Sequence, residues 1–180
     1  MKHVITNPEI GDSVTYVHTA KETNGATTEL EVVLQPGGGN PLHYHRSYDE
    51  IFTAIEGDLG VGFQKGKTII LKPGESYTIK GRQVHRFFNP GDTVIRFRDT
   101  LHPGHEGFEN HLRILYGLAA DGMTDRKKKP KKLKHLAIIA VMSDTLMPGI
   151  LSLAMPLLRV IEFWARKSGE EKALIDKYCA

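Results

Sequence analysis

The stretch GGGNPLHYHRSYDEIFTAIEG, residues 37–57, places two histidines and a glutamate between glycine turns. His43, His45 and Glu50 can each offer a lone pair to a metal ion, and His85 follows in a second stretch rich in turn residues. Three imidazoles and one carboxylate suit a first-row transition metal, because calcium and magnesium prefer oxygen ligands. The sequence therefore predicts a transition-metal site assembled from two segments of the chain.

The spacing of these residues predicts how they meet. His43 and His45 are two apart, so both imidazoles point to the same side of an extended strand. Glu50 has an odd offset from His45 and would face the other way on a straight strand, so the residues between them must bend or bulge. His85 must come from a distant strand that barrel closure brings alongside.

The first stretch resembles the first motif of the cupin family. That motif reads glycine, five residues, His-x-His, three or four residues, glutamate, six residues, glycine. Every position is matched in this chain, by Gly37, His43, His45, Glu50 and Gly57.

The second motif of the family is matched in part. It reads glycine, five residues, Pro-x-Gly, two residues, histidine, three residues, asparagine, and Gly74, His85 and Asn89 fit it. Lys80 and Arg82 occupy the proline and glycine positions, so the loop before His85 departs from the pattern while the ligand is retained. The resemblance covers residues 28–98.

The resemblance implies an antiparallel jelly-roll barrel with a metal near its mouth. It implies one divalent ion (iron, manganese, nickel, copper or zinc) on His43, His45, Glu50 and His85, and no further cofactor is expected. Four protein ligands leave one or two coordination positions open for water, substrate or dioxygen, as Lewis-acid or oxygen chemistry requires.

Two classes of function fit this expectation. The first is a metal-dependent enzyme acting on a small organic molecule in the barrel. The resemblance implies oxygenases, isomerases and decarboxylases as candidates; we take a dioxygenase first, with Glu50 as an acid or base if it leaves the metal. The alternative is a non-catalytic metal or small-molecule binding module, for example a sensor with a helical interaction tail.

We expect a mainly β fold followed by a helical extension, with residues 1–104 as the barrel domain and residues 105–180 as the extension. Short segments that alternate apolar and polar residues, separated by turn residues, predict a sandwich or small barrel. The expected strands are residues 12–18, 29–34, 51–55, 59–63, 68–71, 76–79, 86–88 and 93–101. In the last of these, alternation predicts that Arg96 and Arg98 face solvent.

After residue 104 the apolar residues recur at helical spacing. The expected helices are residues 108–119, 133–142, 150–167 and 170–178. The third has apolar residues on two sides, and such a helix is usually buried on two sides. We therefore expect a homodimer or larger homo-oligomer that uses this extension.

A basic run at residues 126–134 raises two other interpretations. Beside amphipathic helices it could contact anionic lipids, but the adjoining apolar stripe suits burial in protein better. Nucleic acid is not expected, because the run has no interleaved aromatic residues. The longest uncharged apolar run, residues 145–158, holds Pro148 and Pro156 and is shorter than the about 20 residues of a spanning helix.

The remaining observations concern single residues. Cys179 is the one cysteine, so no internal disulfide can form, and together with the absence of an apolar leader this predicts a cytoplasmic protein. Tyr44 lies between the two ligand histidines and is expected to face away from the metal. No role is assigned to Tyr48 or to the histidines at 102, 105 and 111.

Overall fold

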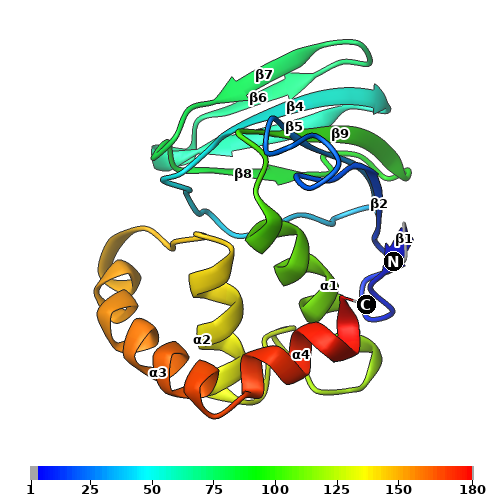
Figure 1. Cartoon of the computed structure of the whole chain (residues 1–180). Helices are drawn as coiled ribbons and strands as arrows, with labels where there is room; N and C mark the ends of the chain where they lie inside the picture. Colours follow the sequence, from blue (N-terminus) through cyan, green and yellow to red (C-terminus); the bar gives the residue numbers. More distant parts are fainter. Residues whose placement is uncertain (1–3, 180) are drawn as a thin grey trace.

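The computed structural model describes residues 4–179, in which strands come first and helices follow (Figure 1). Each strand expected from the sequence is present. The strands are β1 Val4–Thr6, β2 Ser13–His18, β3 Thr28–Leu34, β4 Asp49–Glu56, β5 Leu59–Phe63, β6 Thr68–Leu71, β7 Ser76–Ile79, β8 His85–Phe88 and β9 Ile95–His102. β5, β6 and β7 have the expected ends, the ends of the other five are shifted, and β1 was not expected.

The strands form two antiparallel sheets. The larger has the order β1-β2-β3-β9-β4-β7 and the smaller the order β6-β5-β8. Strands far apart in sequence, such as β3 and β9, are neighbours in space, as expected of a jelly roll. The predicted jelly-roll fold with C-terminal helices is confirmed, with helix and strand each at about 31% of the residues.

Side-chain alternation places the core between the two sheets. In β9 the residues alternate between buried and half-buried, so Phe97 and Leu101 lie inside and are fully buried. Arg96 and Arg98 lie on the other face, where they pair with Glu56, Glu29 and Glu31. The prediction that both arginines face away from the core is confirmed.

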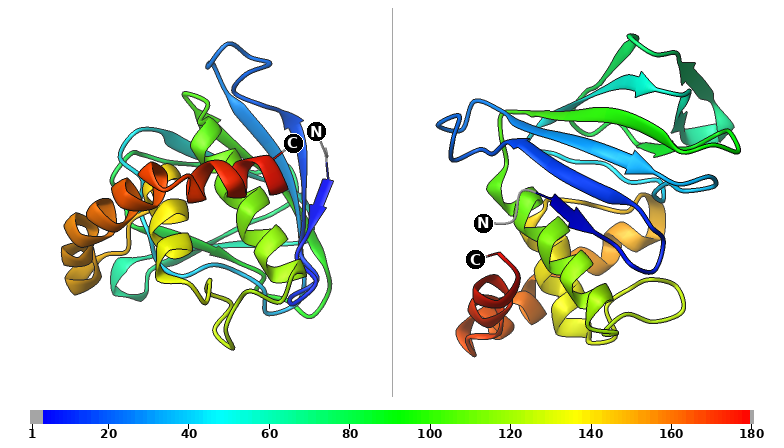
Figure 2. Two further views of the ribbon diagram at one scale, coloured as in Figure 1. Left: turned by 60° about the horizontal axis from the view of Figure 1, so that its bottom comes forward. Right: turned by 90° about the vertical axis from the view of Figure 1, so that its right-hand side faces the viewer.

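The helices form a layer against one end of the barrel, as the two further views in Figure 2 also show. The third predicted helix is divided, because a 3-10 segment, η2, precedes α3. The helices are α1 Glu106–Ala120, α2 Leu133–Met142, η2 Gly149–Ala154, α3 Met155–Lys167 and α4 Glu170–Tyr178, with a further 3-10 turn, η1 Gln64–Gly66, among the strands.

Helix α1 is fastened to the barrel by Glu109. Its carboxylate accepts hydrogen bonds from the Ala20 amide (2.6 Å) and the Thr28 hydroxyl (2.5 Å), and its carbonyl accepts one from the Tyr16 hydroxyl (2.9 Å). All these groups are buried, where a lost partner is costly. Helix α1 therefore has a fixed position on the barrel, and the later helices pack on it.

Between α2 and α3 the chain returns to the barrel. Leu146 and Tyr44 exchange backbone hydrogen bonds of 2.9 and 3.0 Å, so residues 143–146 lie beside the segment that leads into β4. That segment crosses the end of the barrel facing the helices (Figure 1). The division into a barrel domain, residues 1–104, and an extension, residues 105–180, stays a prediction. Among the described residues, no helix is long and apolar enough to cross a membrane.

Candidate metal centre

The four predicted ligands lie together inside the barrel. His43, His45, Glu50 and His85 each offer one ligand atom, and these atoms all lie within 4.8 Å of one another. Their exposed fractions are 5%, 3%, 3% and 0%. The structure thus brings the sequence-predicted site residues into one buried cluster.

Backbone pairing sets the position of two ligands from different motifs. The His43 amide donates to the His85 carbonyl and the His85 amide to the His43 carbonyl, both at 2.9 Å. The two ring centroids are consequently 4.4 Å apart. The expectation that closure of the barrel brings His85 alongside is confirmed.

A bend brings Glu50 to the same site. The chain bends at Arg46 and Ser47 before β4 begins, as the odd offset of Glu50 required. The loop at residues 80–82, where the sequence departs from the second motif, is held on this bend. The Arg82 amide donates to the His45 carbonyl at 2.5 Å, and the Gly81 amide donates to the Asp49 carboxylate at 2.8 Å.

The tautomers of two histidines follow from their Nδ1 atoms. Nδ1 of His43 lies 2.9 Å from the Pro41 carbonyl, and Nδ1 of His85 lies 2.9 Å from the Gln83 carbonyl. A carbonyl only accepts, so each Nδ1 carries a proton. The Nε2 atom of His43 then has a free lone pair. His85 carries protons on both ring nitrogens, because its Nε2 donates to Glu50 Oε2 at 2.7 Å, and it would have to release that proton to bind a metal.

The environment of His45 Nε2 shows whether a metal ion fits the cluster. Its Nε2 atom is buried and has no hydrogen-bond partner, although Glu50 Oε2 lies 3.6 Å away. A buried polar atom without a partner is costly and calls for an explanation such as an absent ion. Together with the three-imidazole, one-carboxylate donor set, this orphaned nitrogen fits a transition-metal ion.

Burial and mutual charge set the pKa values of the cluster. Burial, followed by the neighbouring His85, lowers the pKa of His43 to about 4, and burial lowers that of His45 to about 3. Burial opposes ionisation of Glu50, but the hydrogen bond from His85 and the nearby imidazoles outweigh it and lower the Glu50 pKa. Burial also disfavours charged His85, yet its hydrogen bond to Glu50 raises the His85 pKa. His43 and His45 are therefore neutral ligands at neutral pH.

Two further residues at the site were not singled out from the sequence. Asp99 is 3% exposed, and burial and then Glu50, to which it hydrogen-bonds, raise its pKa well above the ordinary value. The alternation of inward and outward residues along the strand could have indicated Asp99, because it shares the inward face of β9 with Phe97. Tyr48 follows the bend before β4 and places its hydroxyl 2.6 Å from His45 Nδ1.

Aromatic side chains pack around the cluster. The ring centroid of Phe52 lies 5.9 Å from that of His85, and that of Phe108 lies 6.0 Å from that of His45. Phe87 packs on Phe52 and Phe97. The site is thus apolar around a polar centre, as small-molecule sites commonly are.

The histidines at 102, 105 and 111 have local roles. His105 caps α1 by accepting the Phe108 amide at 3.0 Å, and His111 lies 3.1 Å from the Phe108 carbonyl. His102 lies 3.0 Å from the Ala26 carbonyl. These bonds account for one nitrogen of each imidazole.

Comparison with known proteins agrees with the motifs. Residues 30–102 match the family model described as "Cupin domain" (Cupin_2). These residues are a cupin domain. The chain is also 31% identical over 94 residues to germin-like protein 8-2 of Oryza sativa subsp. japonica. That match covers 47% of this chain and 42% of the rice protein, so the chain spans less than half the length of this curated relative.

Solved structures with a similar fold include several cupins. An RmlC-like cupin from Shewanella frigidimarina has a TM-score of 0.49 and 21% identity, over 58% of this chain and 86% of that one. The polyketide cyclase RemF from Streptomyces resistomycificus has 0.46 and 21%, over 51% and 64%. A recombinant oxalate oxidase in complex with glycolate has 0.45 and 28%, over 53% and 54%.

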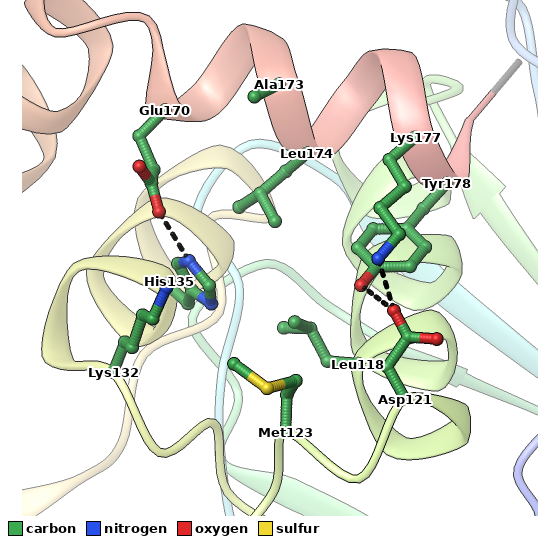
Figure 3. A pocket seen from close by; sticks show the side chains of 10 residues that line it. All are labelled: Leu118, Asp121, Met123, Lys132, His135, Glu170, Ala173, Leu174, Lys177 and Tyr178. Carbon is green, nitrogen blue, oxygen red and sulfur yellow. Dashed lines mark hydrogen bonds and ion pairs between the residues drawn. The ribbon is translucent and has the colours of Figure 1, made fainter.

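Two pockets lie away from the cluster of His43, His45, Glu50 and His85. One, of about 500 Å³, lies among α1, α2 and α4, where His135 bonds to Glu170 and both Lys177 and Tyr178 bond to Asp121 (Figure 3). The other, of about 600 Å³, lies on the small sheet beside Tyr77. Neither is lined by a member of the cluster.

Proposed function

We propose that the cupin domain binds one divalent transition-metal ion through His43, His45, Glu50 and His85 and uses it on a small organic molecule. The observation that carries this proposal is the buried cluster of four donors with an orphaned Nε2 on His45. Iron, manganese, nickel, copper and zinc all accept this donor set, because cells select among them by geometry and supply as well as affinity.

The bound ion would supply a Lewis acid and a coordination site for oxygen or substrate. Our first candidate activity is that of a dioxygenase, ahead of an isomerase or a decarboxylase. The aromatic walls formed by Phe52, Phe87 and Phe108 support a small, largely apolar substrate, since they exclude water and offer ring faces for packing.

Within this proposal Glu50 has two roles. As a carboxylate it binds the ion, and when released from it Glu50 can take up a proton at Oε2, where His85 now donates its Nε2 proton at 2.7 Å. Asp99, hydrogen-bonded to Glu50, supplies a second carboxyl at the same place. The pair therefore offers a path for a proton within the barrel.

The second candidate is a non-catalytic metal or small-molecule binding module. It is favoured by the low exposure of the four donors, at most 5%, and by residues 143–146, which lie across the segment that carries His43 and His45. A structural or sensing ion needs no open path to solvent, whereas an enzyme does.

Metal content tests the proposal. Protein purified without added metal should hold close to one transition-metal ion per chain by elemental analysis, and the variant His43→Ala/His45→Ala should hold none. The matched control His18→Ala removes an exposed histidine and should keep the parent's content. A parent with no metal, or a double variant with unchanged metal, overturns the proposal. Incubating the loaded protein with candidate substrates under dioxygen then separates the two candidates, with an oxygen electrode to detect an oxygenase and chromatography of the products to detect an isomerase or a decarboxylase.

We further propose that the chain forms a homodimer through α3. Large apolar side chains of η2 and α3 are exposed, more than scattered surface residues account for. In α3, Leu157, Val160 and Trp164 follow a 3-4 spacing, which is the seam of a helix pair rather than the broad face of a membrane-lying helix. The exposed residues are Ile150, Leu153, Leu157, Val160, Phe163 and Trp164. The cytoplasmic location stays a prediction.

A further inference from the structure

We propose that residues 143–146 of the helical extension, acting with Tyr48, position the metal ligand His45 and complete the metal centre. The inference rests on the proposed metal function, but the effect of Tyr48 on the tautomer of His45 can be measured without metal. It makes Tyr48 a positioning residue and assigns the extension a role in metal binding.

The extension is hydrogen-bonded to the bend at Arg46 and Ser47, next to His45. The Asp144 carboxylate accepts from the Arg46 amide at 2.8 Å, from Arg46 Nε at 2.9 Å and from the Ser47 hydroxyl at 2.9 Å. Two residues further on, Leu146 exchanges backbone bonds with Tyr44. These bonds join the extension to residues on both sides of His45, so its backbone is fixed from outside the barrel.

Tyr48 transmits this attachment to the imidazole. Its hydroxyl donates to the Ser143 carbonyl at 3.1 Å and lies 2.6 Å from His45 Nδ1, with the two rings stacked at 4.5 Å. A hydroxyl has one proton, and the carbonyl can only accept it. The Tyr48 oxygen therefore accepts from His45, and Nδ1 is the protonated nitrogen.

The consequence lies at the other nitrogen of the ring. With Nδ1 protonated, the lone pair of His45 is on Nε2, the buried atom with no partner that faces Glu50. Partners of this kind fix the tautomer and the ring orientation of metal-binding histidines, and losing them typically costs 10- to 100-fold in metal affinity. His43 and His85 obtain the same support from carbonyls of their own segments. His45 depends instead on Tyr48 and on the residues that follow α2: the Ser143 carbonyl accepts from Tyr48, and the Thr145 hydroxyl lies 3.5 Å from His45 Nδ1.

The variant Tyr48→Phe tests the inference against the matched control Tyr16→Phe. Both remove one buried hydroxyl that donates to a carbonyl of the helical layer, but Tyr16 bonds to Glu109, not to a ligand. In titrations of metal-free protein with Co²⁺, we expect the Kd of Tyr48→Phe to rise about 10- to 100-fold with an altered visible spectrum. Tyr16→Phe should bind within about twofold of the parent. Equal Kd values for Tyr48→Phe and the parent overturn the inference.

Imidazole ¹⁵N NMR of the metal-free protein gives a second readout. The parent should show His45 as the Nδ1–H tautomer, and Tyr48→Phe should show a mixture. If the parent binds no Co²⁺ but the His45 tautomer still differs between the parent and Tyr48→Phe, the metal function is refuted and the positioning role of Tyr48 is retained. Mixed tautomers in the parent overturn the inference whatever the metal result.

The variant Asp144→Ala tests the attachment itself. It removes the acceptor of Arg46 and Ser47 and a negative charge near Tyr48, while leaving every atom of Tyr48 and His45. Asp144→Asn lacks the same charge but keeps an acceptor, so a difference in Co²⁺ affinity between the two variants reports on position. Asp144 has φ +51°, which asparagine tolerates, so Asp144→Asn should recover part of the lost affinity. The control Glu56→Gln weakens a surface ion pair with Arg96 and should change nothing. Parent-like Co²⁺ affinity in Asp144→Ala contradicts the role of the extension.

Discussion

His43 and His85 are a hydrogen-bonded backbone pair, each donating its amide to the other's carbonyl at 2.9 Å. Because the two residues belong to different motifs, the four donors meet only when the segment before β4 pairs with β8. The donor cluster therefore depends on that pairing, and a ligand bound there would stabilise the folded state by mass action.

Acidification should destabilise the metal-free protein. The pKa values of His43 and His45 are lowered by burial to about 4 and about 3, so below pH 6.5 the unfolded chain binds protons that the folded chain does not. Stability is then lost as the pH falls from about 6.5 towards 4, by about 1.4 kcal/mol per pH unit for each histidine. The raised pKa of His85 adds no slope in this window, because its ordinary pKa is already above it.

Urea unfolding of the metal-free protein at pH 7, 6 and 5 checks this expectation. The control is the variant His43→Gln/His45→Gln, whose unfolding free energy should change less with pH over the same range. Identical pH slopes for the two proteins would contradict it.

Asp99→Asn should be at least as stable as the parent at pH 8. Burial and the neighbouring Glu50 raise the Asp99 pKa, so the folded state retains a proton that the unfolded state releases, and stability falls as the pH rises. An amide of the same shape removes that cost. Asp99→Ala should instead lose about 1–3 kcal/mol, since it leaves a cavity. Thermal melts at pH 5 and 8 measure both, and a large loss for Asp99→Asn at pH 8 would refute the neutral carboxyl.

Gly107→Ala should destabilise the protein by about 1–3 kcal/mol, although alanine is the better helix former. A methyl group at Gly107, in α1, would overlap the backbone carbonyl of Met142 at the end of α2, and backbone cannot swing aside. The shift would also move Ser143, so Co²⁺ affinity should fall with stability. Gly91→Ala, whose nearest neighbour atom is 3.7 Å away, is the neutral control in the same denaturant titration.

Leu157→Glu/Trp164→Glu should convert a dimer to a monomer. Both side chains lie on the exposed seam of α3, with 61% and 66% of their surface accessible, and buried carboxylates at a helix pair are costly. Light scattering after size exclusion reads the mass, and Val94→Glu, at an exposed residue outside α3, should leave it unchanged. A monomeric parent would refute the dimer; flotation of the parent with anionic vesicles would then indicate a membrane surface instead.

Local sequence was enough to predict most of the elements. Alternation in β3 and β9 and helical spacing in α1 and α2 come from short-range geometry, which a single sequence displays. Shorter segments were missed: β1 has three residues, and the 3-10 segment η2 divides the expected third helix after Pro148.

The sequence by itself determined the donors of the proposed metal site. The side chains of His43, His45, Glu50 and His85 carry their chemistry wherever they lie, and the spacing of two motifs was sufficient to select them. It also required the bend before Glu50, because strand parity is a local property.

Only the tertiary structure decided what surrounds these donors. Asp99 lies beside Glu50, and Ser143 and Asp144 hold Tyr48 and Arg46, through contacts between segments distant in sequence. No pattern in the sequence of either segment predicts such a contact. It forms because α1 is fixed to the barrel by Glu109 and α2 packs against α1, so the chain after α2 returns to the ligand segment.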